Sequence, residues 1–563
     1  MFGDEIDSLL ADVRQAVFDK RYTQAVSLLE EGKIRWPMDT RIARQAGDLY
    51  LNQKLYRLAL AEYRRADELE PRNPEILHDI AKTHGYLGSN AAAVFVLENA
   101  LAIAEPGDLR TSIIDDLSWM YFKTYRMDTG IALLESELSS QFNRGWAHTL
   151  GTLYSGIYNL EQARKWYLLS IGEAEISGDT AFAAVAYHNL SLLEITFYNY
   201  GEARKYAAKS LELQNRAGGH LIAGDLDMTA WNIPAALNSY QEAESIDNTP
   251  LSRISIADLY QRTGRLNEAI YFINKINAEA DESWMYSWGT NSVHFGMSLS
   301  QILADAWKGK ARTEALTPRW GRGARIRRFF TALAWRARGL YYDLHSRSLR
   351  TIHAAQLAAE GNILDSEFNA FLYSQGYRRA AVRHLEKARE LETALTAASI
   401  PWYTMEAGIE EKNPRYLAKA LETFQPEERN PAERTLRALA ELSGRRGSGA
   451  ALASLYKLNP GGLRQYGLSL PVRITSGSAG HKRRAARILK SAGYTVVKEP
   501  HPAAAVLTIS IREDNIFWYL AKPDGQTISK TKTGRVSGKR EMAPILAGLL
   551  DQFYTTPLSG ADN

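Results

Sequence analysis

A frame that recurs every 34 residues constrains the fold of this chain more than any other feature. Ala25, Ala59 and Ala93 are spaced by 34 residues each, and each is followed by a large apolar or aromatic residue after four positions and a small one after seven. Self-similarity at a period of this length is typical of repeat architectures, in which each copy is one supersecondary unit. The frame therefore predicts a helical solenoid for the first half of the chain.

Further copies extend the frame toward the middle of the sequence. Weaker ones lie around Gly130, Ala163, Ala203, Ala236 and Ala269, with about six residues inserted near 176–180. We expect eight copies over residues 6–282, each a pair of antiparallel helices. Small residues allow the two backbones to approach closely, large apolar residues fill the grooves between them, and a proline ends the second helix.

The second copy carries a resemblance to a known family. Its residues Gly47-x-x-Tyr50 … Ala59-x-x-x-Tyr63-x-x-Ala66 … Pro71 resemble the tetratricopeptide repeat. The tryptophan usual near the start of each repeat is absent, and the seventh copy lacks a clear first-helix signature. The resemblance implies a right-handed superhelical solenoid whose concave groove binds peptides or partner proteins, and it implies no chemistry.

The resemblance also implies which residues face a partner. In the family, places five, nine and twelve of each first helix line the groove, and here these places hold Arg44, Asp48, His78, Lys82, Asp115, Trp119, His148 and Thr152. Trp119 is an aromatic anchor of the kind that interfaces favour. For any single one of these residues, a solvated helix face is an equally good interpretation. The Lys/Asn clamp that some members use for a terminal carboxylate is not in register, which disfavours a chaperone-type co-receptor.

A strongly basic segment follows the repeats. Residues 308–350 contain twelve Lys and Arg against two acidic residues, after an aromatic-rich stretch at 281–307. Residues 324–346 are predicted to form a helix with one apolar face, made of Ile326, Phe329, Phe330, Leu333, Ala337, Leu340, Tyr341 and Leu344. The basic patch in and before this helix comprises Arg319, Arg322, Arg325, Arg327, Arg328, Arg336 and Arg338.

Three interpretations of the basic helix compete. It is a solenoid helix whose apolar face is core, or it contacts an anionic membrane surface or an acidic protein, or its arginines contact nucleic acid. We favour the first, and nucleic acid is the least favoured.

The pattern changes again toward the carboxyl end. Degenerate helical pairs are expected around Ala381, Leu385 and Ala388 and over 401–424 and 431–460, and alternating residues then predict strands at 472–475, 494–497, 506–512, 516–522 and 526–533. Helices are expected at 481–492 and 542–554. We therefore divide the chain into a solenoid at 1–282, an aromatic and basic helical segment at 283–350, degenerate tetratricopeptide-like pairs at 351–465 and a small α/β domain at 466–563. The fold class is mostly α, with this one small α/β domain.

The last domain is similar to the amino-terminal domain of the Tol–Pal translocation protein. The similarity rests on the strand at 504–510, the turn at Asp524-Gly525, Gly534 and the final amphipathic helix, less than a fifth of the chain. It implies an envelope-associated assembly, while a generic α/β cap on a solenoid is the favoured alternative. The domain is basic, with fourteen Lys and Arg against seven acidic residues in 471–563.

Composition and motifs argue against chemistry. Cysteine is absent from all 563 residues, which excludes disulfides, thiolate metal sites and cysteine nucleophiles. No nucleophile elbow, zincin helix, phosphate loop or calcium loop is present, and the histidines are scattered. We expect no catalytic residues, no metal site and no cofactor. No apolar run reaches the roughly 20 residues that cross a bilayer, so we expect a soluble protein, cytoplasmic or, if a leader is missing, periplasmic.

Two functions follow from the sequence. The first is a non-catalytic scaffold or adaptor that binds protein or peptide partners in a multiprotein assembly. The alternative is a peripheral membrane or cell-envelope component, as in pilus, flagellar, secretion or cell-wall machinery, anchored through residues 325–346. The oligomeric state stays open.

Overall fold

The computed structural model describes residues 2–124, 126–157, 159–247, 250–279, 292–359, 404–405, 408–409, 412–442, 449–501, 503–512, 515–522, 525–534, 536 and 538–554. These residues fall into two compact units. The first contains residues 2–193 and 354–359, and the second contains the other described residues from Glu194 onward. The predicted pairs around Ala381 and the aromatic residues at 284–288 lie outside the described residues, as does the loop at 444–448. No helix among the described residues has the length and apolar character that a membrane span requires.

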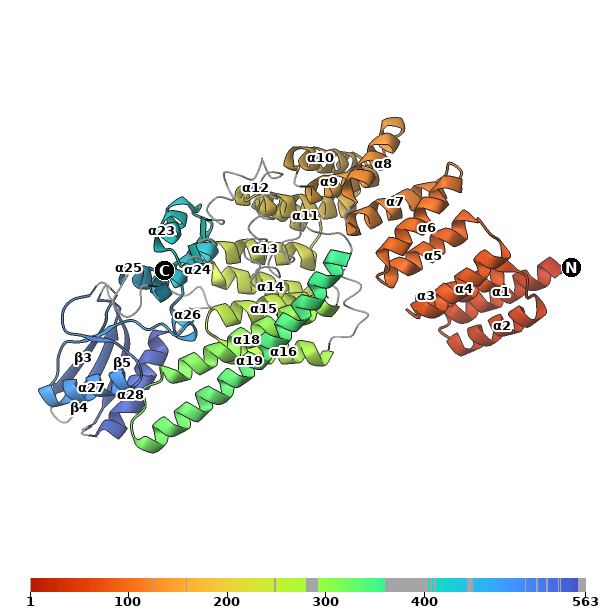
Figure 1. The fold of residues 1–563 in the computed structure, drawn as a ribbon. Helices are drawn as coiled ribbons and strands as arrows, with labels where there is room; N and C mark the ends of the chain where they lie inside the picture. Colours follow the sequence, from red (N-terminus) through yellow and green to blue (C-terminus); the bar gives the residue numbers. More distant parts are fainter. Residues whose placement is uncertain are drawn as a thin grey trace. The chain divides into compact units, whose positions relative to one another are not determined.

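Eight helix pairs follow one another from residue 2 to residue 279, as the frame predicts (Figure 1). The pairs are α1 (Phe2–Phe18) with α2 (Tyr22–Arg35), α3 (Thr40–Asn52) with α4 (Tyr56–Leu69), α5 (Pro74–Tyr86) with α6 (Asn90–Ile103), α7 (Asp108–Lys123) with α8 (Met127–Ser140), α9 (Arg144–Gly156) with α10 (Leu160–Ile176), α11 (Thr180–Thr196) with α12 (Tyr200–Leu213), α13 (Ala217–Thr229) with α14 (Ile233–Asp247), and α15 (Pro250–Arg262) with α16 (Leu266–Glu279). The insertion predicted near 176–180 lengthens α10 and α11 to 17 residues each.

Small residues close each pair. Ala25, Ala59 and Ala93 are fully buried, and a Cβ atom added to Gly47 would lie 2.5 Å from the ring of Tyr63 in the facing helix. The same contact joins Gly151 to Tyr167 and Gly224 to Tyr240. The seventh pair therefore has the close helix approach although its first helix lacks the expected signature, because Gly224 occupies the position of Gly47.

The turn within a pair has a fixed backbone geometry. One residue in the turn adopts a left-handed conformation in the pairs at Lys20, Lys54, Gly88, Tyr198, Trp231 and Gly264, with φ between 56° and 84°. Four of these residues are not glycine. For a residue with a side chain, the left-handed conformation costs about 1 kcal/mol. The turn thus depends on the packing of the two helices that it joins.

A longer helix pair continues the second unit. It consists of α18 (Ser292–Ala315) and α19 (Arg322–Ala359). The two helices run antiparallel, as the contacts of Lys308 with Asp343 and of Ser300 with His345 show. After the undescribed stretch come α23 (Pro414–Thr423), α24 (Arg429–Leu442), α25 (Gly449–Leu458) and α26 (Pro460–Gln465).

The segment just before α24, together with α25 and α26, contacts the turns of the last three repeat pairs. The Trp231 indole donates to the carbonyl of Leu458 at 2.7 Å, and Asn459 donates to the carbonyl of Arg262 at 2.9 Å. Gly264 lies so close to Gly461 that an added Cβ would be 2.3 Å from the Gly461 carbonyl oxygen. The Trp231 indole N–H and the Arg262 carbonyl, which lie at these turns, therefore find their hydrogen-bond partners about 200 positions later in the sequence.

The carboxyl-terminal part contains the predicted small α/β domain. Strands β1 (Val472–Ile474), β2 (Val496–Val497), β3 (Ala505–Arg512), β4 (Asn515–Ala521) and β5 (Thr527–Thr533) form one sheet in the order β2-β1-β3-β4-β5. The first three strands in this order are parallel and the last three antiparallel, with Thr508 opposite Tyr519 and Tyr519 opposite Lys530.

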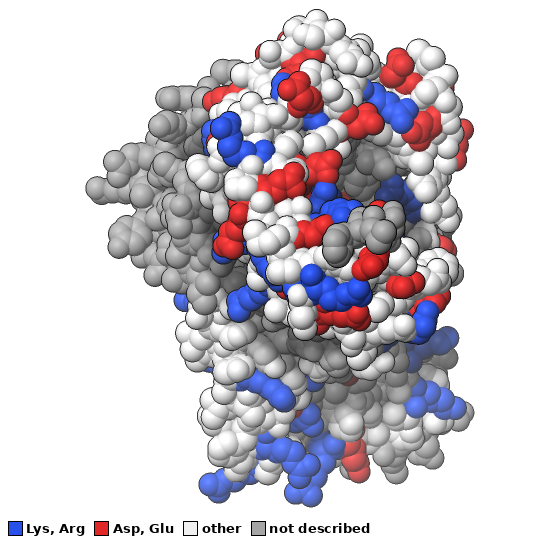
Figure 2. Space-filling model, turned by 90° about the vertical axis from the view of Figure 1, so that its right-hand side faces the viewer, with Lys and Arg blue, Asp and Glu red and all other residues white. Residues whose placement is uncertain are grey.

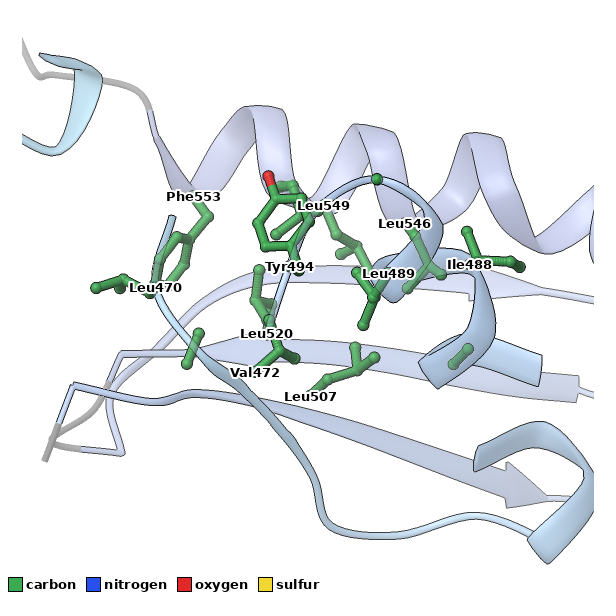
Figure 3. Packing of buried hydrophobic residues seen from close by; sticks show 14 of the residues in the cluster. Leu470, Val472, Ile488, Leu489, Tyr494, Leu507, Leu520, Leu546, Leu549 and Phe553 are labelled. Atoms are coloured by element: carbon green, nitrogen blue, oxygen red, sulfur yellow. The ribbon is translucent and has the colours of Figure 1, made fainter. Parts of the chain in front are cut away.

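Two helices cover one face of this sheet. They are α27 (Ala479–Ser491) and α28 (Lys539–Phe553). Figure 3 shows leucines of both helices meeting Val472, Leu507 and Leu520 of the strands, and all of these side chains are buried. The core of the domain therefore lies between the sheet and these two helices, as the alternating pattern in the strands requires.

Candidate protein-interaction surfaces

The predicted groove residues lie on the first helices of pairs two to five, which are α3, α5, α7 and α9. Three of these helices begin at a side-chain cap. Asp39, Asn73 and Asn143 each accept a hydrogen bond from backbone N–H groups of the first turn of α3, α5 and α9, as N-cap residues do. The start of each helix, and with it the direction of its later side chains, is thus set locally.

Several predicted groove residues connect one first helix to the next. Arg44 on α3 pairs with Asp79 on α5 at 2.8 Å, and it also contacts Glu75. His78 on α5 lies 2.7 Å from Asp116 on α7. His148 on α9 lies 2.9 Å from Asn189 on α11. These contacts join α3 to α5, α5 to α7 and α9 to α11, and we call them the polar ladder.

Two more of the predicted residues bind within their own pair. Asp48 accepts a hydrogen bond from the hydroxyl of Tyr63 at 2.7 Å, and Thr152 shares one with the hydroxyl of Tyr167 at 2.9 Å. Burial, outweighing the Tyr63 hydrogen bond, raises the pKa of Asp48 above its ordinary value. Burial lowers the pKa of His148 to about 4, so this imidazole is neutral near pH 7. Both groups therefore act as structural hydrogen-bonding partners.

The remaining three predicted residues lie on α5 and α7. Lys82 and Asp115 are exposed, and Trp119 has 43% of its surface exposed. The Trp119 ring stacks on Phe122 with centroids 5.2 Å apart, and the Lys123 ammonium lies 5.7 Å from it. We call Lys82, Asp115, Trp119, Phe122 and Lys123 the Trp119 cluster.

The polar ladder indicates how Lys82 on α5 and Trp119 on α7 are oriented relative to each other. Lys82 follows His78 by about one helical turn, and Trp119 follows Asp116 by about one turn. Because His78 and Asp116 are in contact, helix spacing leads us to expect Lys82 and Trp119 on the same side of α5 and α7. Although part of the Asp115 side chain reaches solvent, neighbouring atoms shield its carboxylate from water. This shielding, and then repulsion by Asp116, raises the pKa of Asp115 to about 6.

Charge on the amino-terminal repeats is mixed. Figure 2, which looks onto these repeats, shows acidic and basic side chains interleaved. Such a surface is complementary to a partner peptide that carries charges of both signs and an apolar side chain to pack on Trp119.

Sequence reasoning missed the partners that complete the ladder. Asp79 and Asp116 each follow a predicted groove residue directly, and Asn189 comes 41 positions after His148. Their spacing of roughly one repeat from the residues that they bind is the signal that was present in the sequence.

A second surface lies on α19 in the second unit. The helix packs on α18 through Gly339, where an added Cβ would be 2.8 Å from Lys308, and through the buried Asp343 and Ser346. The opposite face carries large apolar side chains that are 48% to 63% exposed, namely Ile326, Phe329, Phe330, Leu333, Leu340, Tyr341 and Leu344. The favoured expectation that this face is core is wrong for these residues, because α18 occupies the other side of the helix.

The predicted basic patch divides into structural and exposed arginines. Arg319 pairs with Glu314 at 2.7 Å, and Arg328 donates to the carbonyls of Thr317 and Ser491. The Arg338 guanidinium lies 4.7 Å from the ring of Trp307.

The remaining arginines of the patch face solvent. Arg322, Arg325, Arg327 and Arg336 are exposed, and none of the four has an ion-pair partner among the residues that the structure describes.

No group of His, Asp and Glu side chains that would suit a metal ion occurs in the described part of the chain.

Comparison with known proteins gave matches among solved structures only. No family model matches the chain, and no curated protein matches it. Among solved structures, a tetratricopeptide repeat protein from Parabacteroides merdae is similar, with 15% identity, 45% of this chain and 97% of that chain covered, and a TM-score of 0.40. PilW, a type IV pilus biogenesis factor, is similar with 18% identity, 37% and 92% coverage and a TM-score of 0.32. YrrB, described as a tetratricopeptide protein with an unusual peptide-binding site, shares 14% identity over 34% of this chain and 95% of its own, with a TM-score of 0.27.

The helix pairs themselves define the class of the protein. Their period, the close approach at Gly47, Gly151 and Gly224, and the buried alanines are those of a tetratricopeptide-type solenoid. The described residues therefore have the fold of a tetratricopeptide-type solenoid, followed by a small α/β domain near the carboxyl end.

Proposed function

We propose that the protein is a non-catalytic scaffold that binds a protein or peptide partner at the Trp119 cluster and thereby takes part in a multiprotein assembly. The observation that carries the proposal is the exposed Trp119 on α7, in a row of first helices on which Arg44, His78 and His148 are already paired. An exposed aromatic residue beside charges of both signs is typical of an interaction hot spot.

A pull-down with the full chain tests this proposal. Trp119→Ala combined with Lys82→Glu removes the anchor and reverses one charge on exposed positions, so the fold is expected to persist while partner recovery falls at least about tenfold. Phe95→Ala combined with Lys54→Glu is the matched control, because Phe95 is exposed on a second helix and Lys54 lies in a turn. Equal recovery with wild type and the Trp119 variant would discard the assignment.

A second candidate function is that of a peripheral membrane or cell-envelope component of pilus, flagellar, secretion or cell-wall machinery, anchored through residues 325–346. The exposed apolar face of α19 favours it. The similarity of the last domain to the Tol–Pal translocation protein stays a prediction that points the same way.

A further inference from the structure

The apolar face of α19 forms one continuous stripe. From Ile326 to Leu344 an apolar residue recurs every three or four positions, with Ala337 between Leu333 and Leu340, and Phe330 and Tyr341 widen the stripe beside Phe329 and Leu340. This is the spacing of a single helix face. At about 1.5 Å per residue the stripe is roughly 27 Å long. Exposed apolar patches of this extent mark interaction sites in proteins that are otherwise polar outside.

The position of α19 in the stack explains why the stripe is open. In the preceding pairs the second helix buries its outer face on the first helix of the next pair, as where Ala59, Tyr63 and Ala66 of α4 share a core with Ile76 and Ile80 of α5. The described residues contain no corresponding helix against the stripe of α19. The helix is nevertheless held firmly, by the Lys308–Asp343 ion pair at 2.9 Å and by the hydrogen bond from Arg328 to the Ser491 carbonyl at 3.2 Å.

Arginines border the stripe on both sides. At about 100° per residue, Arg325 and Arg336 lie along one border. Arg327 lies along the other border, as does Arg338, whose guanidinium is 4.7 Å from the ring of Trp307. Asp343 is the one acidic residue between positions 322 and 349, and it is buried against Lys308.

Charge and shape select the partner. A second copy of the chain would bring rows of arginines against each other, and nucleic acid would leave the phenylalanines without a role. A convex stripe with Phe329, Phe330 and Tyr341, bordered on both sides by arginines, has the form of a helix that lies in the plane of a membrane interface, its apolar face among acyl chains and its cations on lipid phosphates.

We propose that α19 docks the protein on an anionic phospholipid surface, with the helix axis parallel to the membrane. This inference deepens the second candidate function, on which it rests, and is independent of partner binding at the Trp119 cluster. It names the ligand chemistry, which is phosphate-bearing lipid with a net negative headgroup.

Vesicle flotation with the full chain tests the proposal. We expect the protein to float with vesicles of phosphatidylcholine and phosphatidylglycerol, to float at least about tenfold less with phosphatidylcholine alone, and to be partly released by high salt. Phe329→Ser with Phe330→Ser, and separately Arg325→Glu with Arg336→Glu, should each reduce recovery about tenfold. These side chains are exposed, so circular dichroism is expected to remain that of wild type.

Two control variants change residues of similar exposure away from α19. Phe95→Ser changes an equally exposed phenylalanine in the first unit, and Lys205→Glu with Lys209→Glu reverses two exposed charges on α12; both should float like wild type. Equal recovery from neutral and anionic vesicles overturns the anionic assignment while a peripheral membrane role stands. No flotation, or flotation unchanged in the α19 variants, overturns the proposal and removes the second candidate function as well.

Discussion

At the scale of single residues, the glycines that face a paired helix determine how closely the two helices can approach each other. Gly47 faces the Tyr63 ring so closely that any side chain must displace it. Gly172, in the interior of α10, has no atom within 4 Å of an added Cβ. The same substitution is therefore expected to have opposite effects at the two positions.

We expect Gly47→Ala to lower the free energy of unfolding by about 1–3 kcal/mol through overpacking, and Gly172→Ala to raise it by up to about 1 kcal/mol through helix propensity. Urea denaturation followed by circular dichroism measures both. Destabilisation of similar size in the two variants would contradict the close-packing argument.

His148 makes stability depend on pH. Its pKa is about 4 in the folded chain because the ring is buried, against an ordinary value of 6.5. Between these values the unfolded chain binds a proton that the folded chain does not, so stability is full above pH 6.5 and falls as the pH drops toward 4. His148→Gln should flatten this fall by on the order of 2 kcal/mol, as measured by denaturation at a series of pH values.

Asp115 acts with the opposite sign. Its folded pKa of about 6 lies above its ordinary value of 3.8, mainly because neighbouring groups shield it from water. The folded chain takes up this proton first, so acidification below pH 6 stabilises it, and that contribution is lost as the pH rises through 6. Asp115→Asn should therefore steepen the loss of stability in acid. A profile like that of His148→Gln would refute the assignment.

The small residues could be predicted from the sequence and the polar ladder could not. Ala59, Gly47 and Tyr63 recur at fixed spacing, and packing allows few alternatives there. His78 and Asp79 are neighbours on one helix, and which of them faces a partner depends on residues about 30 to 40 positions away. A single sequence contains no direct record of such pairs.

At the scale of elements, the turns within pairs share one geometry but differ in surroundings. Gly88 and Gly264 both have positive φ angles, 72° and 84°. An added Cβ at Gly88 meets nothing within 4 Å, whereas one at Gly264 would strike the Gly461 carbonyl oxygen of α26.

Gly88→Lys should be tolerated with a loss of about 1 kcal/mol, since Lys20 and Lys54 adopt the same conformation. Gly264→Lys should add a steric conflict that detaches α26, which limited proteolysis would show as faster cleavage near residues 459–467. Equal proteolysis of the two variants would argue against close contact at this turn.

The sequence predicted the type and position of these helices and strands better than it predicted what each of them packs against. The period of α19 and the alternation of the strands β3 to β5 predict their positions to within about two residues, apart from the carboxyl end of α19, which continues past the predicted end. The apolar stripe of α19 is the same whether a neighbouring helix or solvent faces it, so periodicity alone could not show that the stripe is exposed.

At the scale of the molecule, the carboxyl-terminal helices support the last repeats. Trp231, Arg262 and Gly264 contact residues of α25 and α26 or the junction between them. Contacts between residues so distant in sequence have no local signature, and the predicted division at 282 contained no indication of them.

Truncation after residue 424 should expose this edge. Amide hydrogen exchange is expected to accelerate in α13 to α16, because Trp231 and the Arg262 carbonyl lose their partners, and to stay unchanged in α3 to α9. Measurement by mass spectrometry resolves the two regions. Uniform acceleration, or none, would show that the last repeats do not depend on α24–α28.

The bond between Trp231 and Leu458 spans 227 residues, and this has a consequence for synthesis. At about 5–20 residues per second, a ribosome needs roughly 10 to 45 seconds to make that stretch. During that time the earlier repeats emerge with an apolar indole uncovered, and the edge closes only when the carboxyl-terminal helices arrive. The last steps of maturation are therefore expected to follow translation, and the newly made chain is a substrate for chaperones until then.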